Sequence, residues 1–165
     1  MPIVSGIISG FVASFMFFMW LCLIRPKVDV SKEVTVEEVD GKVYYRVKVV
    51  NLTRAMLTNL RYSLYYCKEN RDTLVKMHEI PPKSTKLACI AAYDKKDKLN
   101  EYAVVFKYEV NPEEMPMEEG CKLVFYFLAD HGVSNTSACI RKSYYKDDIV
   151  RAVFARGKST DIVIQ

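Results

Sequence analysis

The segment Arg141-Lys142-Ser143-Tyr144-Tyr145-Lys146 has residue types that are well suited to binding an anionic ligand. Its three cations can contact phosphate oxygens and its two tyrosines can stack on nucleobases, a combination typical of single-stranded nucleic acid or nucleotide binding. Tyrosines and cations also alternate between the two faces of an ordinary β-strand, and the sequence leaves this alternative open. We predict a ligand site formed by Arg141, Lys142, Tyr144, Tyr145 and Lys146.

Residues typical of catalysis or metal binding are few. The two histidines, His78 and His131, are far apart in the sequence, and no paired-carboxylate, Walker A, GxGxxG or GxSxG motif occurs. The five cysteines show no CxxC spacing, so neither a zinc site nor a redox pair is predicted. The net charge of +4 is spread along the chain, which favours a modest anion-binding site over extensive nucleic-acid coating. We therefore expect a binding protein without cofactor or metal, not an enzyme.

An uncharged apolar run extends from Ile3 to Ile24 and is followed directly by Arg25, Pro26 and Lys27. At about 1.5 Å per residue, a helix of this length covers roughly 30 Å, which matches the hydrocarbon core of a lipid bilayer. Because the nearest cations follow the run, the positive-inside rule places the N-terminus outside and the rest of the chain in the cytoplasm. A cleaved signal peptide is the alternative, but the sequence lacks the basic n-region and the small-residue cleavage site that it requires.

Small residues gather on one side of this predicted transmembrane helix. They form two series at four-residue spacing, namely Ser5, Ser9 and Ala13, and Gly6, Gly10 and Ser14. Gly-x-x-x-Gly spacing lets helix backbones approach closely, so the face is suited to helix association in a membrane. In a ring of helices the same face would line a narrow pore, with the bulky residues that follow it as an apolar constriction. A simple packed dimer or an accident of composition is the alternative. Since a single helix cannot enclose a pore, any pore requires oligomerisation.

From Val28 onward hydrophobic residues recur at every second position, which indicates β-strands. Asp40-Gly41 predicts a tight turn within a hairpin over roughly residues 28–50, because both central residues of a type I′ turn need positive φ. A helical turn or strand is expected at residues 147–155 and a closing strand at 161–164. Further strands are expected at residues 60–67, 75–80, 86–93, 102–110, 122–130 and 138–145. The series predicts one antiparallel β-sandwich over residues 28–165, preceded by a membrane helix and junction over residues 1–27.

Three motifs stand out in residues 25–65: Arg25-Pro26-Lys27 after the apolar run, Asp40-Gly41-Lys42 in the hairpin, and Lys48-Val49-Val50-Asn51-Leu52 at the end of the next strand. With these motifs, residues 25–65 resemble the cytoplasmic domain of inward-rectifier potassium channels. Leu57 and Leu64 match apolar positions of that family. The resemblance implies an immunoglobulin-like sandwich that assembles as a homotetramer beneath a membrane pore. The chain has no second membrane helix, no pore helix and no Thr-x-Gly-Tyr-Gly filter, so potassium selectivity is not implied.

In overall plan the chain is also similar to single-pass, channel-like effectors of bacterial anti-phage systems of the Hailong type. In that type the cytoplasmic domain senses an oligodeoxyadenylate made by a partner nucleotidyltransferase. The similarity implies an antiviral-defence effector in the bacterial inner (cell) membrane, with a nucleotide or short single-stranded oligonucleotide as ligand. We therefore predict a homo-oligomeric pore or membrane-perturbing effector gated through Arg25, Pro26 and Lys27, where Pro26 stiffens the junction. A membrane-tethered binding or assembly module that conducts nothing is the alternative.

Overall fold

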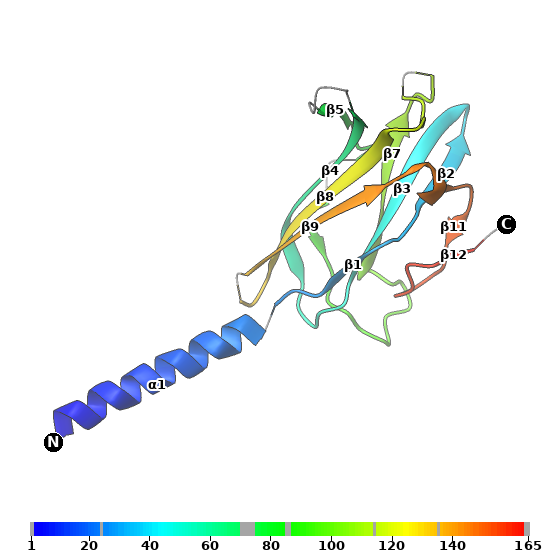
Figure 1. The fold of residues 1–165 in the computed structure, drawn as a ribbon. Helices are drawn as coiled ribbons and strands as arrows, with labels where there is room; N and C mark the ends of the chain where they lie inside the picture. The colour runs from blue at the N-terminus through cyan, green and yellow to red at the C-terminus, as the bar shows by residue number, and fades with distance from the viewer. Residues whose placement is uncertain are drawn as a thin grey trace.

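The computed structural model describes residues 2–23, 25–69, 75–84, 87–113, 115–134 and 136–163. Within them the chain forms one α-helix and a series of short strands, coloured along the chain in Figure 1. In order these are α1 (Pro2–Leu23), β1 (Val28–Val30), β2 (Val34–Val39), β3 (Lys42–Asn51), β4 (Leu57–Glu69), β5 (Val75–Ile80), β6 (Cys89–Ile90), β7 (Ala103–Val110), β8 (Cys121–His131), β9 (Ser137–Tyr144), the 3-10 turn η1 (Lys146–Asp148), β10 (Ile149–Val150), β11 (Val153–Phe154) and β12 (Ile162–Val163).

Sheet 1 is built on the long strand β3, which pairs with β1 and β2 along one edge and with β7 along the other. Asp40 and Gly41 connect β2 to β3 with φ angles of 52° and 74°, so the predicted hairpin and its left-handed turn are confirmed. β10 extends the sheet beyond β2 and runs parallel to it. This short parallel pair corrects the expectation of a wholly antiparallel domain. It arises because the chain crosses over from sheet 2 through η1 before it reaches the edge of β2.

Sheet 2 has the order β5, β4, β8, β9, with β6 beside the first residues of β4. The register of β4 against β8 shifts between Thr58 and Arg61, where Asn59 has a φ of 51°. Beyond this β-bulge Leu64 is buried in the core, so its neighbour Tyr65 is placed on the outer face by the alternation of the strand. β9 is the edge strand of this sheet, since it pairs with β8 alone among the described strands.

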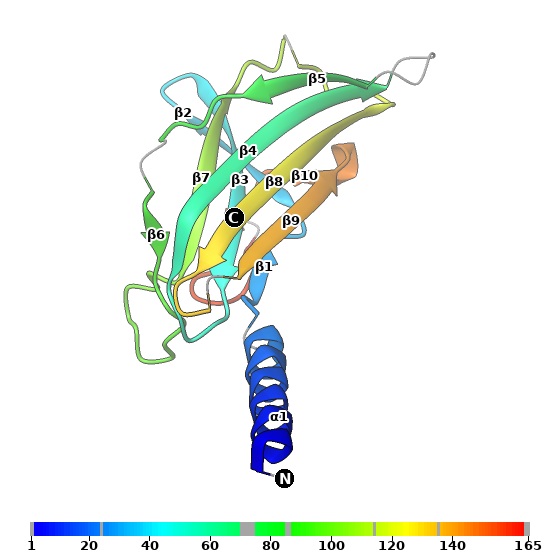
Figure 2. The same ribbon diagram turned by 90° about the vertical axis from the view of Figure 1, so that its left-hand side faces the viewer.

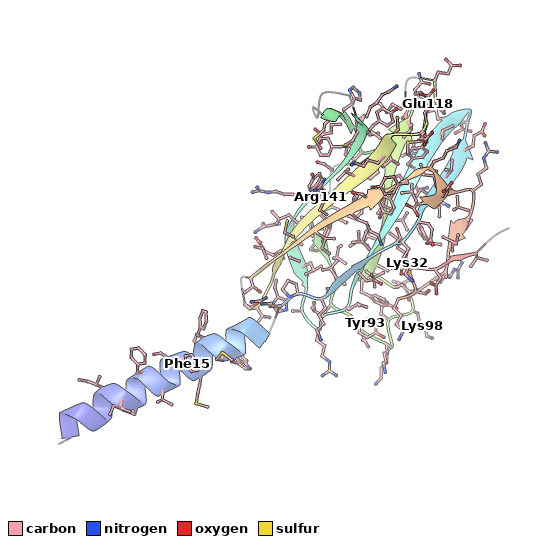
Figure 3. All side chains as sticks on the ribbon, viewed as in Figure 1. Phe15, Lys32, Tyr93, Lys98, Glu118 and Arg141 are labelled. Atoms are coloured by element: carbon pink, nitrogen blue, oxygen red, sulfur yellow. The ribbon has the colours of Figure 1, made fainter. Side chains whose placement is uncertain are left out.

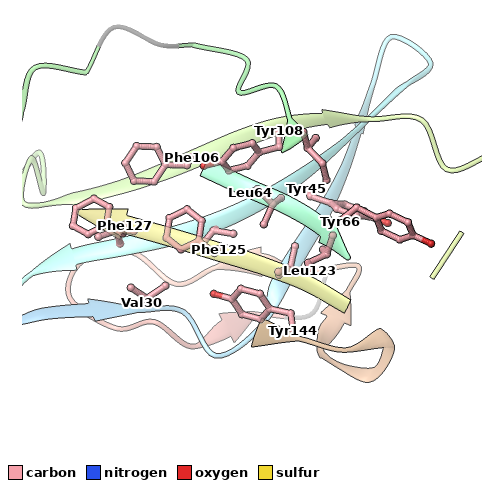
Figure 4. Close-up of a cluster of buried hydrophobic side chains, with 14 of the residues drawn as sticks. Val30, Tyr45, Leu64, Tyr66, Phe106, Tyr108, Leu123, Phe125, Phe127 and Tyr144 are labelled. Atoms are coloured by element: carbon pink, nitrogen blue, oxygen red, sulfur yellow. The ribbon is translucent and has the colours of Figure 1, made fainter. Parts of the chain in front are cut away.

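The two sheets face each other, and the core lies between them (Figures 1 and 2). Aromatic rings fill its centre, as Figure 4 shows. The ring centroids of Phe106 and Phe125 are 6.2 Å apart, and those of Tyr108 and Phe125 are 6.4 Å apart. Such tilted and edge-to-face pairs add about 0.5–1.5 kcal/mol each beyond the burial of their area. The aromatic core holds the two sheets in a fixed relative position and leaves the other side of each strand to form the outer faces.

The C-terminal residues cover the outer face of sheet 1. β11 and β12 pair as a small antiparallel hairpin, and two buried cations of β3 reach carbonyl groups of residues 152–159. Residues 147–155, which were expected to form a helical turn or a strand, contain both: the end of η1, followed by β10 and β11. The closing strand is confirmed as β12. We call residues 151–163 the C-terminal strap.

α1 projects away from the sheets, as both ribbon views show (Figures 1 and 2). Its described side chains, at residues 6–20, are all exposed. The mainly β class with one helix near the N-terminus is confirmed. No helix within the described residues is long and apolar enough to cross a membrane, so the structure does not support the predicted transmembrane segment.

Candidate functional site

The predicted basic segment runs along β9 into η1, and strand alternation sends its side chains in different directions. Arg141 is exposed on the outer face of sheet 2 and is labelled in Figure 3. Lys142 is half-buried and Tyr144 is fully buried, both on the inner side, while Tyr145 and Lys146 follow the strand and are exposed. The five residues are therefore not gathered into one site, because neighbours in a strand face opposite ways.

Lys142 and Tyr144 attach β9 to the chain around β1. The Tyr144 hydroxyl donates a hydrogen bond to the carbonyl of Ser31 at 2.9 Å, and the Lys142 ammonium donates to the carbonyl of Val30 at 3.1 Å. Burial raises the pKa of Tyr144 and lowers the pKa of Lys142. The polar atoms of both side chains are thus engaged within the protein, which is the structural role that the sequence left open.

The outer face of sheet 2 carries an aromatic patch formed by Tyr65, Tyr126 and Arg141. These residues come from β4, β8 and β9, and Arg141 stands directly opposite Tyr126 in the antiparallel register. The rings of Tyr65 and Tyr126 meet edge to face with their centroids 5.7 Å apart, and the Arg141 guanidinium carbon lies 5.8 Å from the Tyr126 centroid. Sequence reasoning missed both tyrosines, because the register that brings them to Arg141 joins strands far apart in the chain.

The aromatic patch suits a ligand that combines a negative charge with a planar group. A guanidinium attracts phosphate, and phenol rings stack on bases regardless of their identity. On the same face, Cys67 and Val124 are almost completely buried although they lie on the outward-facing side of their strands. Burial raises the pKa of the Cys67 thiol, while the positive charges of Lys122 and Arg141 act in the opposite direction. The aromatic patch is therefore bordered by buried apolar side chains.

The end of the predicted segment has a balanced charge. Lys146 is followed by Asp147 and Asp148, and the backbone N–H of Tyr145 donates to the Asp148 carboxylate at 2.8 Å. Tyr145 remains 57% exposed, so its ring is available for contact. The two carboxylates offset the attraction of Lys146 for a phosphate, which leaves Arg141 as the better placed cation of the segment.

Arg46 and Lys48 on the outer face of sheet 1 are two buried cations that sequence reasoning did not single out. The Lys48 ammonium donates to the carbonyls of Ala155, Gly157 and Ser159 at 2.6, 2.8 and 2.6 Å. Arg46 donates to the carbonyl of Ala152 at 2.7 Å and lies 3.2 Å from a carboxylate oxygen of Glu37. Protein atoms of the C-terminal strap and of β2 take up these donors, so Arg46 and Lys48 hold the strap in place.

The small-residue face predicted for α1 is open along the described part of the helix. A Cβ atom added at Gly6 or Gly10 would meet nothing within 4 Å. The Ser9 hydroxyl donates to the carbonyl of Gly6 at 3.0 Å, so its polar group is satisfied within the helix. Ala13 and Ser14 continue the face and are exposed, whereas the side chain of Ser5 lies outside the described residues. Space for a closely packed partner helix is therefore present.

The junction between α1 and β1 is short and partly fixed. The carbonyl of Lys27 accepts a hydrogen bond from the backbone N–H of Leu52 at 2.8 Å, while the side chains of Arg25 and Lys27 are exposed and Pro26 is half-buried. Arg25 and Lys27 also line a cavity of about 340 Å³ together with the loop after β3 and the hairpin after β8. Their predicted gating role stays a prediction.

His131 is buried at the end of β8. It is 3% exposed, and its Nδ1 accepts a hydrogen bond from the backbone N–H of Ser134 at 3.2 Å. Among the described residues no three His, Cys, Asp or Glu side chains are close enough to hold a metal ion.

No protein-family model matches this chain, and no curated protein matches it. The resemblance of residues 25–65 to inward-rectifier channels and the similarity in plan to anti-phage effectors therefore stay predictions.

Proposed function

We propose that this chain is a membrane-anchored, homo-oligomeric effector whose β-domain controls the association of its α1 helices. In this proposal α1 inserts into a lipid bilayer, several copies of α1 pack through the small-residue face to form a pore, and the immunoglobulin-like β-domain lies in the cytoplasm. The aromatic patch binds the regulating ligand. By the similarity to anti-phage effectors, that ligand is a nucleotide or short single-stranded oligonucleotide from a partner nucleotidyltransferase.

The exposure of α1 is the observation that carries the proposal. Ten large apolar side chains between residues 7 and 20 are exposed, from 47% at Met19 to 79% at Phe11. Removing one such side chain from water is worth about 1.5–3 kcal/mol, so leaving ten of them in water would cost as much as the net stability of a typical domain. Lipid or neighbouring helices remove this cost. The uncharged sequence also continues beyond the described side chains as far as Ile24, which lengthens the segment available for insertion.

Homo-oligomer formation is supported by the glycines of α1. Gly6 and Gly10 weaken an isolated helix by roughly 1 kcal/mol each relative to alanine, and neither is required by a contact within the chain. Two helices that meet at these glycines can approach closely and gain van der Waals contacts that lipid does not supply. The glycines are therefore better explained by contacts between copies than by the fold of one copy.

Release of a dye from vesicles tests the pore. The full chain is reconstituted into vesicles loaded with a fluorescent dye, with and without oligodeoxyadenylate, beside the variant Gly10→Leu. We expect release that depends on the oligonucleotide for the wild type and no release for Gly10→Leu. Circular dichroism of the variant controls for the β-domain, which α1 does not help to build.

A membrane-tethered binding module is the second candidate, and one observation favours it. The described side chains of α1 are apolar on every side apart from the small-residue face, where the Ser9 hydroxyl bonds its own backbone. Such a helix also suits a simple lipid anchor. Oligonucleotide binding without dye release, in vesicles that contain the inserted protein, would establish the tether and exclude the pore.

A further inference from the structure

At the end of the β-domain next to α1, hydrogen bonds join two loops and the junction into one surface. The loop after β3 (residues 52–56) is bonded to the junction through Leu52 N–H and the Lys27 carbonyl at 2.8 Å. The hairpin after β8 is bonded to the same loop through Gly132 N–H and the Met56 carbonyl at 2.9 Å. A Cβ at Gly132 would lie 3.0 Å from that carbonyl, so glycine permits the close approach. Figures 1 and 2 show this end beside α1.

Large apolar side chains at this end point into solvent. Val133 is 74% exposed, Met56 47% and Leu52 39%. Each lies on a loop whose backbone is fixed by the bonds described above, so its exposure is a property of the fold. Single exposed apolar residues are common on protein surfaces, but three on adjoining loops next to an apolar helix form a continuous feature.

Cations surround these apolar side chains. Arg25, Lys27 and Arg54 are all exposed, and together with Leu52 and Val133 they line the cavity of about 340 Å³. In the described part of the chain none of the three cations has a carboxylate within 4.0 Å. None of these charges is therefore engaged in a direct ion pair with a described residue.

The opposite end of the β-domain carries an acidic loop. Its loop between β7 and β8 contains Glu113, Glu118 and Glu119, and Figure 3 labels Glu118 there, far from α1. The Asp40-Gly41 turn of the β2–β3 hairpin is likewise polar. The residues that line the cavity beside α1 include three cations and no carboxylate, whereas the loop between β7 and β8 at the opposite end is acidic.

We propose that the end formed by Leu52, Met56, Val133, Arg25, Lys27 and Arg54 docks on an anionic lipid surface. Val133, Met56 and Leu52 enter the headgroup region, and the three cations contact lipid phosphates. This inference rests on the proposed insertion of α1, which brings the same end to the bilayer. A negative surface attracts each nearby Lys or Arg enough to change partitioning about fivefold, an effect that fades beyond a Debye length of roughly 10 Å. Docking would hold the β-domain at a fixed orientation to α1.

Quenching of tryptophan fluorescence by brominated lipids tests the docking. Trp20 is the only tryptophan, so Trp20→Phe gives a background without tryptophan. In that background Val133→Trp reports on the docking end, and Met77→Trp serves as the control, because Met77 is also exposed (49%) but lies on β5 at the far end. The wild-type protein, with Trp20 present, reports separately on insertion of α1.

In vesicles rich in phosphatidylglycerol we expect strong quenching of Trp20 and of Val133→Trp, and none of Met77→Trp. Quenching of Val133→Trp should fall several-fold in phosphatidylcholine vesicles and when Arg25, Lys27 and Arg54 are replaced by Gln. If Trp20 is quenched but Val133→Trp is no more quenched than Met77→Trp, docking is wrong while insertion stands. Equal quenching in both vesicle types would overturn the role of the cations, and an unquenched Trp20 would overturn the proposed insertion itself.

Discussion

Replacing Lys48 by methionine should loosen the C-terminal strap from sheet 1. Methionine has a similar length but no ammonium, so the change removes three hydrogen bonds to the carbonyls of Ala155, Gly157 and Ser159. A hydrogen bond to a charged group contributes about 1.5–3 kcal/mol. The Lys48 side chain is almost fully buried, and burial lowers its pKa, so desolvation of the ammonium opposes part of this gain. We expect a net loss of about 2–4 kcal/mol.

Amide hydrogen exchange measures this loss where it occurs. The Ala155 N–H is bonded to the Asp161 carbonyl at 3.0 Å within the strap, so its exchange reports opening of that segment. A loss of about 2–4 kcal/mol corresponds to exchange faster by roughly 30-fold to 1,000-fold. Lys42→Met is the matched control on the same strand, because Lys42 forms only an exposed ion pair with Glu109 and does not contact the strap. Unchanged exchange at Ala155 in Lys48→Met would refute the assignment of Lys48 as the residue that holds the strap.

Four further predictions concern α1, the aromatic patch, the junction and alkaline pH. Gly10→Leu should abolish the oligomer measured by cross-linking in membranes without altering the circular dichroism of the β-domain, since a Cβ there meets nothing within its own chain. Arg141→Gln should weaken oligonucleotide binding and reduce the slope of log affinity against log salt by about one, measured by fluorescence anisotropy; an unchanged slope would remove Arg141 from the site. A flexible Gly/Ser insertion after Lys27 should preserve oligonucleotide binding but uncouple it from dye release, and a parental response would exclude rigid coupling. Burial raises the pKa of Tyr108 and Tyr144 in the folded protein, so both stay protonated above pH ~10 while the tyrosines of the unfolded chain ionise. The free energy of unfolding, measured by urea titration, should therefore fall above pH ~10 by about 1.4 kcal/mol per pH unit for each tyrosine. A flat profile would contradict their burial.

The strands were predictable wherever one face is buried and the other is not. The expected strands at residues 75–80 and 102–110 agree with β5 and β7 to within one residue, because alternation reports one-sided burial directly. The strand expected at residues 86–93 is mostly not formed where the structure describes it, because this segment has few strand partners in the fold. Within its described part only β6 (Cys89–Ile90) pairs, since the start of β4 offers just Leu57 and Thr58 as partners.

The outer faces of the sheets were beyond sequence reasoning. Strand alternation alone predicts that Lys48 is exposed to solvent. It is buried only because the C-terminal strap crosses the outer face of sheet 1 above it. The partners of Arg141 are likewise set by cross-strand register, which places Tyr126 opposite it. What a sequence pattern shows is the face on which a residue lies, whereas its neighbours on that face depend on strand order and pairing.

The number of copies in the detergent-purified full chain tests the central claim most directly. Native mass spectrometry of the intact protein measures it without any assumption about ligand or ion. The proposed effector predicts a homo-oligomer, with a tetramer expected from the resemblance to inward-rectifier channels, that Gly10→Leu reduces to monomers. A wild-type protein that is monomeric in mild detergent would contradict the association of α1 helices, and with it the pore.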